Sequence, residues 1–201
     1  VLGLGTQFTN GATGDIALEA ALPQDEPDCG FASSPILPPP GTLAAATRLA
    51  DALPALPVSG PATVLIEAAL PSLPTASDGN MLLAQFDGGT DADRLRVHLQ
   101  GGGTSLVAGR VVGGAPADAM PLGAVAAGAR FAVALRHDGA GTLGAAMTGG
   151  AVQTLGGGLA GVTALLLGNN RAGVSPLFGL VRQARLFGRA LSDAELLAAV
   201  A

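Results

Sequence analysis

Between residues 63 and 187 the sequence breaks into short apolar runs that are separated by glycine-containing turns. The clearest run is 94–100, where Leu95, Val97 and Leu99 alternate with charged or polar residues. A period of two places alternate side chains on opposite faces of a β-strand. About eight to ten such runs, spaced about 8–12 residues apart, are typical of an antiparallel sandwich or barrel. We therefore expect an all-β fold.

The distribution of proline divides the chain into two parts. Eleven of the 14 prolines lie in the first 74 residues. Proline cannot donate a hydrogen bond to a sheet, and it restricts the residue before it. We therefore expect a proline-rich N-terminal arm or linker at 1–60 and a β-sandwich at 61–201. The expected strands are 63–69, 81–86, 94–100, 105–112, 130–136, 142–147, 151–155, 162–167 and 180–187.

The last residues of the chain predict a short C-terminal helix at about 193–200. Ser192 and Glu195 have the spacing of a capping box, in which each side chain accepts a hydrogen bond from the backbone N–H of the other residue. Leu196 and Val200 then form an apolar stripe. Because so short a helix is not stable alone, we expect it to dock on the sandwich.

Composition excludes several classes of function. The net charge is −5, and all ten basic residues are arginines, so the chain lacks the excess of positive charge with which proteins neutralise nucleic-acid phosphates. The longest apolar runs, such as 162–167, are much shorter than the roughly 20 residues of a membrane span, and we expect no membrane insertion. The single cysteine, Cys29, has no partner for an internal disulfide.

Four segments resemble a known group of proteins. The stretch 178–196 (FGLVRQARLFGRALSDAEL) is similar to the closing strand and helix of concanavalin A-like, laminin-G-like domains, and 163–170 (TALLLGNN) resembles the strand before it. The stretch 32–51 (ASSPILPPPGTLAAATRLAD) resembles a linker of phage tail and head-fibre proteins, and 16–19 resembles the end of the module that precedes this linker. On this resemblance we place the chain in that group, with the head spikes of phage-like gene transfer agents as candidate relatives.

The resemblance implies a concanavalin A-like antiparallel jelly-roll sandwich that binds glycans on the surface of a phage or phage-like virion. The implied partners are cell-surface polysaccharide and other virion or spike subunits, with the chain itself a homo-oligomer. Sugar sites of this fold normally stack sugar rings on Trp or Tyr, and this chain contains neither. A sugar site would therefore depend on Asp, Asn, Arg and backbone groups, and each single site would be weak.

Two polar loops supply the candidate ligand-binding residues, one after the run 81–86 and one after the run 162–167. These residues are Asp87, Asp91, Asp93, Arg94, Asn169, Asn170 and Arg171. The aspartates around a glycine turn are compatible with Ca²⁺, which takes about six to eight oxygen ligands, but their spacing fits no EF-hand or repeat-type loop, and we favour an acidic turn. The amide loop has the same two interpretations, a turn or a hydrogen-bonding site. We assign no metal and no cofactor.

Catalysis is not expected. The histidines, His98 and His137, have no partner at metal-ligand spacing and are interpreted as surface residues. A retaining glycosidase needs two carboxylates about 5–5.5 Å apart, and no glutamate has a second carboxylate two or four residues away on an expected strand. We therefore predict a non-catalytic glycan-binding module. A purely structural virion subunit that mediates assembly is the alternative, and a degenerate hydrolase is the third hypothesis.

Overall fold

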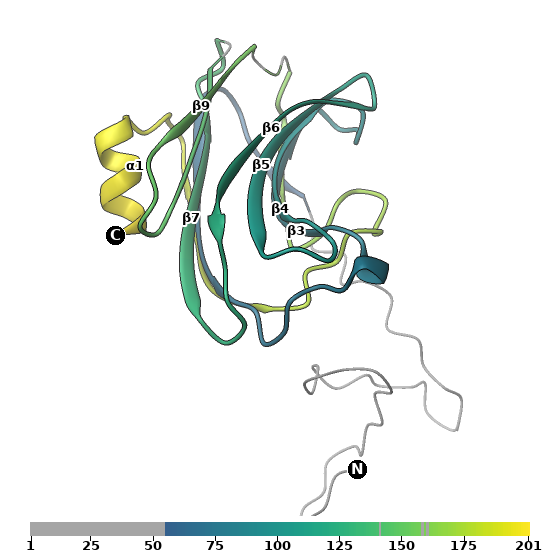
Figure 1. Cartoon of the computed structure of the whole chain (residues 1–201). Coiled ribbons are helices and arrows are strands. Elements are labelled where there is room, and N and C mark those ends of the chain that lie inside the picture. Colours follow the sequence, from purple (N-terminus) through teal and green to yellow (C-terminus); the bar gives the residue numbers. More distant parts are fainter. Residues whose placement is uncertain (1–54, 141, 158, 160) are drawn as a thin grey trace, which may run out of the picture. The chain divides into compact units, whose positions relative to one another are not determined.

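Two antiparallel sheets pack face to face in the computed structural model, which describes residues 55–140, 142–157, 159 and 161–201 (Figure 1). One sheet has the strand order β1-β10-β3-β4-β5-β6, and the other has the order β11-β2-β7-β8-β9. The elements are β1 (Leu56–Pro57), β2 (Ala62–Ala69), η1 (Ala76–Asp78), β3 (Met81–Asp87), β4 (Arg94–Leu99), β5 (Ser105–Val112), β6 (Ala115–Ala124), β7 (Arg130–His137), β8 (Thr142–Met147), β9 (Gln153–Gly156), β10 (Ala164–Leu167), β11 (Leu180–Phe187) and α1 (Asp193–Val200). The predicted all-β sandwich is confirmed.

The core fills the space between the two sheets. Leu95, Val97 and Leu99 of β4 belong to it and are at most 1% exposed, as the alternating pattern predicts. Phe86 of the neighbouring strand β3 is completely buried in the same cluster. Because successive side chains of a strand point to opposite faces, the charged residues of β4 lie on the outer face of the six-stranded sheet.

The predicted C-terminal helix is also confirmed, and it covers the outer face of the five-stranded sheet. Leu196 and Val200 of α1 are buried in a second cluster with Leu65, Ala134 and Ala146 of that sheet. The small alanine side chains on β7 and β8 allow the helix to approach closely. None of the helical segments in the described ranges has the length and hydrophobicity of a membrane span.

A capping box begins the helix, as the sequence indicates. The Ser192 hydroxyl accepts from the N–H of Glu195 at 3.3 Å, and the Glu195 carboxylate accepts from the N–H of Ser192 at 2.8 Å. Arg136 of β7 forms an ion pair of 2.6 Å with Asp193 in the first turn. These bonds fix the helix on the sheet at its N-terminal end.

Strand β6 is a strand that the sequence pattern does not predict. Pro116 and Pro121 interrupt its sequence, and proline is depleted in regular sheets. β6 lies at the edge of the six-stranded sheet, where it pairs only with β5 and tolerates these prolines. The β5–β6 register also shifts between Leu106 and Val107 and again near Arg110, which removes the simple alternation by which a strand is recognised.

The boundary between the two predicted parts lies close to the first described strand. β1 pairs with Leu165 and Ala164 of β10, so this two-residue strand falls within the range 1–60 that the sequence assigns to the arm. The rest of that arm up to residue 54, including Cys29 and the linker-like stretch 32–51, lies outside the described residues. The division at residue 60 stays a prediction.

Candidate functional site

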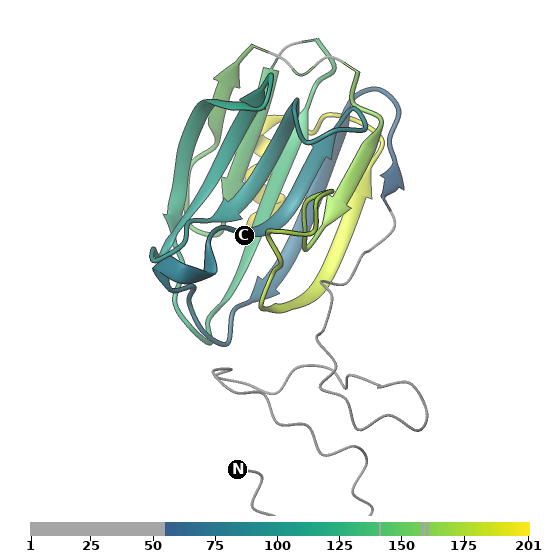
Figure 2. The ribbon, with the colours of Figure 1, turned by 90° about the vertical axis from the view of Figure 1, so that its right-hand side faces the viewer.

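The loop that follows β10, residues 168–179, lies beside β3 over the outer face of the six-stranded sheet (Figure 2). Backbone hydrogen bonds hold it there: the N–H of Leu82 donates to the carbonyl of Ser175 at 3.1 Å, and the N–H of Gly168 donates to the carbonyl of Leu83 at 3.0 Å. The two loops that the sequence analysis selected therefore meet, although they are about 80 residues apart in the chain.

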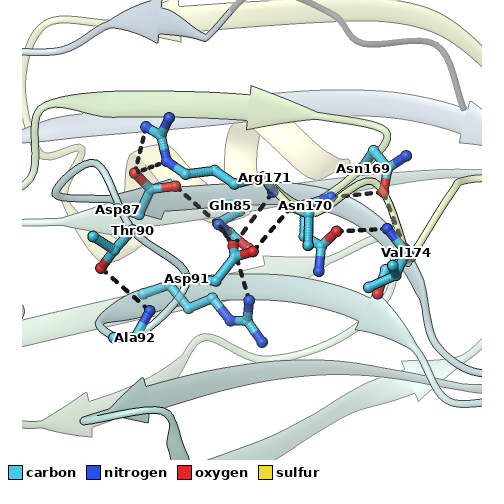
Figure 3. Close-up of polar contacts among 12 residues, drawn as sticks. Gln85, Asp87, Thr90, Asp91, Ala92, Asn169, Asn170, Arg171 and Val174 are labelled. Carbon is cyan, nitrogen blue, oxygen red and sulfur yellow. Dashed lines mark hydrogen bonds and ion pairs between the residues drawn. The ribbon is translucent and has the colours of Figure 1, made fainter.

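Asp87 is the central carboxylate of this meeting point, and its side chain is completely buried (Figure 3). One oxygen, Oδ1, accepts from Arg171 Nε at 2.9 Å, from Arg171 Nη2 at 2.7 Å and from the N–H of Gly89 at 2.8 Å. The other oxygen accepts from Gln85 Nε2 at 2.9 Å. A buried carboxylate with this many charge-assisted bonds joins the β3–β4 turn to the 168–179 loop.

Asp91 makes a second connection between the same loops. Its carboxylate accepts from Gln85 Nε2 at 2.7 Å, from Arg94 Nη1 at 2.9 Å and from the backbone N–H groups of Arg171 and Ala172 at 3.3 and 3.1 Å. Burial raises the pKa of Asp91, but these hydrogen bonds together outweigh it, so the pKa lies below its ordinary value. Asp91 is therefore ionised at neutral pH.

Asn169 and Asn170 shape the loop itself. The amide oxygen of Asn169 accepts from the N–H groups of Asn170 and Ser175 at 2.9 and 3.0 Å, and that of Asn170 accepts from the N–H of Val174 at 2.9 Å. Such bonds from an asparagine side chain to the following backbone are typical of turns. In this structure the side chains of both asparagines stabilise the turn, which agrees with the turn interpretation.

The remaining predicted residue, Asp93, lies apart from this cluster. It is exposed, and its carboxylate accepts from the N–H of Gly113 in the β5–β6 turn at 2.9 Å. Within the described residues no three His, Cys, Asp or Glu side chains are grouped closely enough to hold a metal ion. A calcium ion would need the carboxylate oxygens of Asp87 and Asp91 as ligands. These oxygens accept hydrogen bonds from N–H donors of Arg171, Gln85 and Arg94.

A larger polar feature of this face is the outer-face row, which we define as Gln85, Arg94, Arg96 and His98. The sequence analysis selected only Arg94 from it and missed the other three residues. Gln85 of β3 lies directly opposite Arg96 of β4, and Arg94 lies opposite Asp87. On the other side, β5 places Gly109 opposite Arg96. The row therefore runs along two central strands of the six-stranded sheet, next to the loops already described.

Each member of the outer-face row has a buried polar atom that finds no hydrogen-bond partner in the described part of the chain. These atoms are Gln85 Oε1, Arg94 Nε, Arg96 Nε and His98 Nδ1. Buried polar groups in folded proteins are nearly always hydrogen-bonded, and each exception costs about 1–3 kcal/mol. Four of the six such atoms among the described residues thus lie on one face of two neighbouring strands, and the other two are the ring nitrogens of His137.

Both histidines contradict the prediction that they lie on the surface. His98 is 4% exposed, and its burial, followed by the charges of Arg96 and Arg94, lowers its pKa to about 4. His137 is 3% exposed and packs with its ring edge-to-face against Phe86 at a centroid distance of 4.9 Å. Burial also lowers the pKa of His137, although Asp138 opposes the shift. Both imidazoles are therefore neutral at pH 7.

Part of the row could be found from the sequence and part could not. The alternation in 94–100 already places Arg94, Arg96 and His98 on one face of a strand. Gln85 lies within the apolar run 81–86, which carries no alternation to separate its two faces. The burial of His98 depends on neighbouring strands and on the arginines beside it, and no local pattern records these neighbours.

Neither a protein-family model nor a curated protein sequence matches this chain. Solved structures do. The CBM40 of Ruminococcus gnavus IT-sialidase, bound to α2,3-sialyllactose, has a TM-score of 0.54 and 19% identity over 72% of this chain and 84% of that one. The heptameric SAP-like pentraxin of Limulus polyphemus has a TM-score of 0.51 and 11% identity over 71% of this chain and 70% of that one.

The sialidase of Trypanosoma rangeli is a third similar structure, with a TM-score of 0.54 and 15% identity. The match covers 73% of this chain and 25% of the sialidase, so the chain spans about a quarter of that enzyme. At these identities the likeness concerns the fold. The chain therefore has the concanavalin A-like antiparallel jelly-roll sandwich fold that these structures share.

Proposed function

We propose that this chain is a non-catalytic carbohydrate-binding module and that its ligand lies on the outer-face row of the six-stranded sheet. The observation that carries the proposal is the set of unpartnered buried polar atoms on Gln85, Arg94, Arg96 and His98. Sugar hydroxyls and ring oxygens accept hydrogen bonds, so a sugar can meet the N–H donors of Arg94 and Arg96, which are the partly exposed members of the row. The similar CBM40 structure, which holds a sialylated sugar, supports a glycan as the ligand.

The described glutamates support a non-catalytic role. Glu67 pairs with Arg182 at 3.3 Å on the five-stranded sheet. Glu195 pairs with Arg189 at 2.7 Å and caps α1. Both lie away from the outer-face row, and hydrolysis of a glycosidic bond needs two carboxyl groups that face each other across the bond.

We further propose that this carbohydrate-binding module is part of a virion. The stretch 32–51 resembles the linkers of phage fibre proteins, and this resemblance supports a spike or fibre subunit that adsorbs the particle to polysaccharide on a bacterial cell. In the absence of Trp and Tyr we expect millimolar affinity for each site, about 4 kcal/mol. Many copies on one particle would raise the effective affinity by a factor of about 10²–10⁴.

A purely structural role in particle assembly is the second candidate. The exposed apolar residues on the edge strand β11, among them Leu180 at 66% exposed and Leu186 at 43%, favour contact with another subunit. This role and glycan binding use different faces of the sandwich, so one chain can serve both.

Binding of the purified full chain to bacterial cells, with and without their capsular polysaccharide, tests the proposal. We expect saturable binding that the free polysaccharide inhibits. Binding should fall at least about tenfold when Arg96 and His98 are changed together to Gln, because two members of the outer-face row are lost. Arg182→Gln on the opposite sheet is the matched control and should bind normally. Equal binding by all three proteins would contradict the proposed face, and no binding to any cell or polysaccharide would contradict the function.

A further inference from the structure

Arg96 differs from the other partly buried arginines of the described residues. Each of the others meets a carboxylate within 2.5–2.9 Å: Arg94 with Asp91, Arg110 with Asp118, Arg136 with Asp193 and Arg171 with Asp87. Arg96 is only partly exposed and its Nε is fully buried, yet among the described residues it forms neither an ion pair nor a hydrogen bond. A partly buried charge without a counter-ion is costly, and folded proteins avoid it.

The surroundings of Arg96 do not neutralise its charge. Burial lowers the pKa of Arg96, the positive charge of Arg94 lowers it further, and Asp91 only partly opposes these effects. Asp91 is itself engaged by Gln85 and Arg94. Next along the strand, His98 is neutral at pH 7 because its pKa is about 4. The centre of the outer-face row is therefore positive, and within the described ranges it has no counter-ion of its own.

We infer that the outer-face row binds the carboxylate of an acidic sugar residue, a uronic or sialic acid, with Arg96 as its counter-ion. The inference rests on the proposed function and specifies its ligand class. A guanidinium presents parallel N–H groups that match the two oxygens of a carboxylate. The rest of the sugar ring would lie over the neighbouring part of the outer-face row, where Gln85 faces Arg96 from β3 and His98 follows Arg96 on β4.

Gly109 leaves room for such a ligand beside Arg96. It lies directly opposite Arg96 on β5, where any other residue would place a side chain on the same outer face. A Cβ atom at this position would lie 3.6 Å from His98 Cε1, which is an ordinary contact and not a clash. Packing against the described residues therefore does not require glycine here. A larger side chain would instead cover the surface between Arg96 and His98.

The test compares acids with their own neutral derivatives by NMR titration of the full chain. The probes are the methyl glycosides of glucuronic acid and N-acetylneuraminic acid, each beside the alcohol made by reducing its carboxyl group. We expect at least one acid to bind about tenfold or more tightly than its alcohol, which is the contribution of a charge-assisted pair. Arg96→Gln should reduce the affinity for that acid to that of the alcohol, and the control Arg182→Gln should leave it unchanged.

A second measurement separates recognition from a structural role of Arg96. Because the charge has no partner among the described residues, Arg96→Gln should leave the melting temperature unchanged or raise it. If both alcohols bind as tightly as the acids, the inference fails and the proposed function stands. If no acid binds, or if Arg96→Gln melts at a clearly lower temperature, Arg96 is not a carboxylate receptor. Failure of capsular polysaccharide to bind would instead remove the proposed function.

Discussion

Mild acid should destabilise this protein through His98, well before its carboxylates are protonated. Folding buries the imidazole on the same face of β4 as Arg96 and Arg94, and burial, followed by these two charges, lowers its pKa from 6.5 to about 4. From the neighbouring strands it faces Leu82 and Val107, which carry no charge. The unfolded chain therefore binds a proton at a higher pH than the folded chain does. The contribution of the neutral His98 to stability is complete above about pH 6.5 and is lost as the pH falls toward 4.

The two pKa values set the size of the effect. For a pKa of 6.5 in the unfolded chain and about 4 in the folded chain, the free energy of unfolding falls by about 2 kcal/mol between about pH 8 and pH 5. The loss approaches about 3 kcal/mol at the lower limit of the window. The pKa of the buried His137 is also lowered, so it adds a loss of the same sign.

Urea unfolding followed by circular dichroism at several pH values measures this loss, and it suits a chain that has neither Trp nor Tyr. His98→Gln removes one titrating group and should reduce the pH dependence by about 2 kcal/mol over this range, leaving the part that belongs to His137. A variant with the same pH dependence as the natural chain would show that His98 is not held neutral by the fold. A natural chain with equal stability at about pH 8 and pH 5 would refute the reasoning for both histidines.

Three further predictions concern the cap, the loop cluster and assembly. Ser192→Ala should lower the free energy of unfolding by about 0.5–2 kcal/mol in a urea titration, because the N–H of Glu195 loses its acceptor; an unchanged value would show that the cap is not needed. Asp87→Asn should cost about 2–3 kcal/mol, because Arg171 loses its buried partner, and a smaller effect than Ser192→Ala would contradict the central place of this carboxylate. Light scattering should detect a homo-oligomer, because the edge strand β11 exposes apolar side chains such as Leu180 to another subunit, and a strict monomer at all concentrations would remove this prediction.

The sequence predicts most of the sandwich because its strands carry local signals. Alternation in 94–100, glycine turns and the capping box at Ser192 are properties of neighbouring residues, and each is found in the structure. The sequence does not predict β6, because Pro116 and Pro121 disfavour a strand locally. The edge position of β6 permits these prolines, but this position is a property of the whole sheet.

Local signals in the sequence also indicate some residues of the candidate site, but not how these residues interact. Loop composition selects Asp87, Asp91 and Arg171 as polar residues near turns, but it cannot show that Arg171 bonds to both aspartates. Their role toward a ligand stays a prediction. Loop composition also cannot show that Arg96 lacks a partner among the described residues, since this depends on every element that packs around it. The feature that best indicates a ligand is thus a missing interaction, which only the three-dimensional arrangement reveals.

Backbone amide shifts of the full chain during titration with capsular polysaccharide test the central claim most directly. We predict saturable shifts on β3 and β4 around Gln85, Arg96 and His98, together with loop 168–179, and no shifts around Arg182 on β11 or on α1. Shifts that centre on the five-stranded sheet, or the absence of any saturable shift, would contradict a carbohydrate site on the outer-face row.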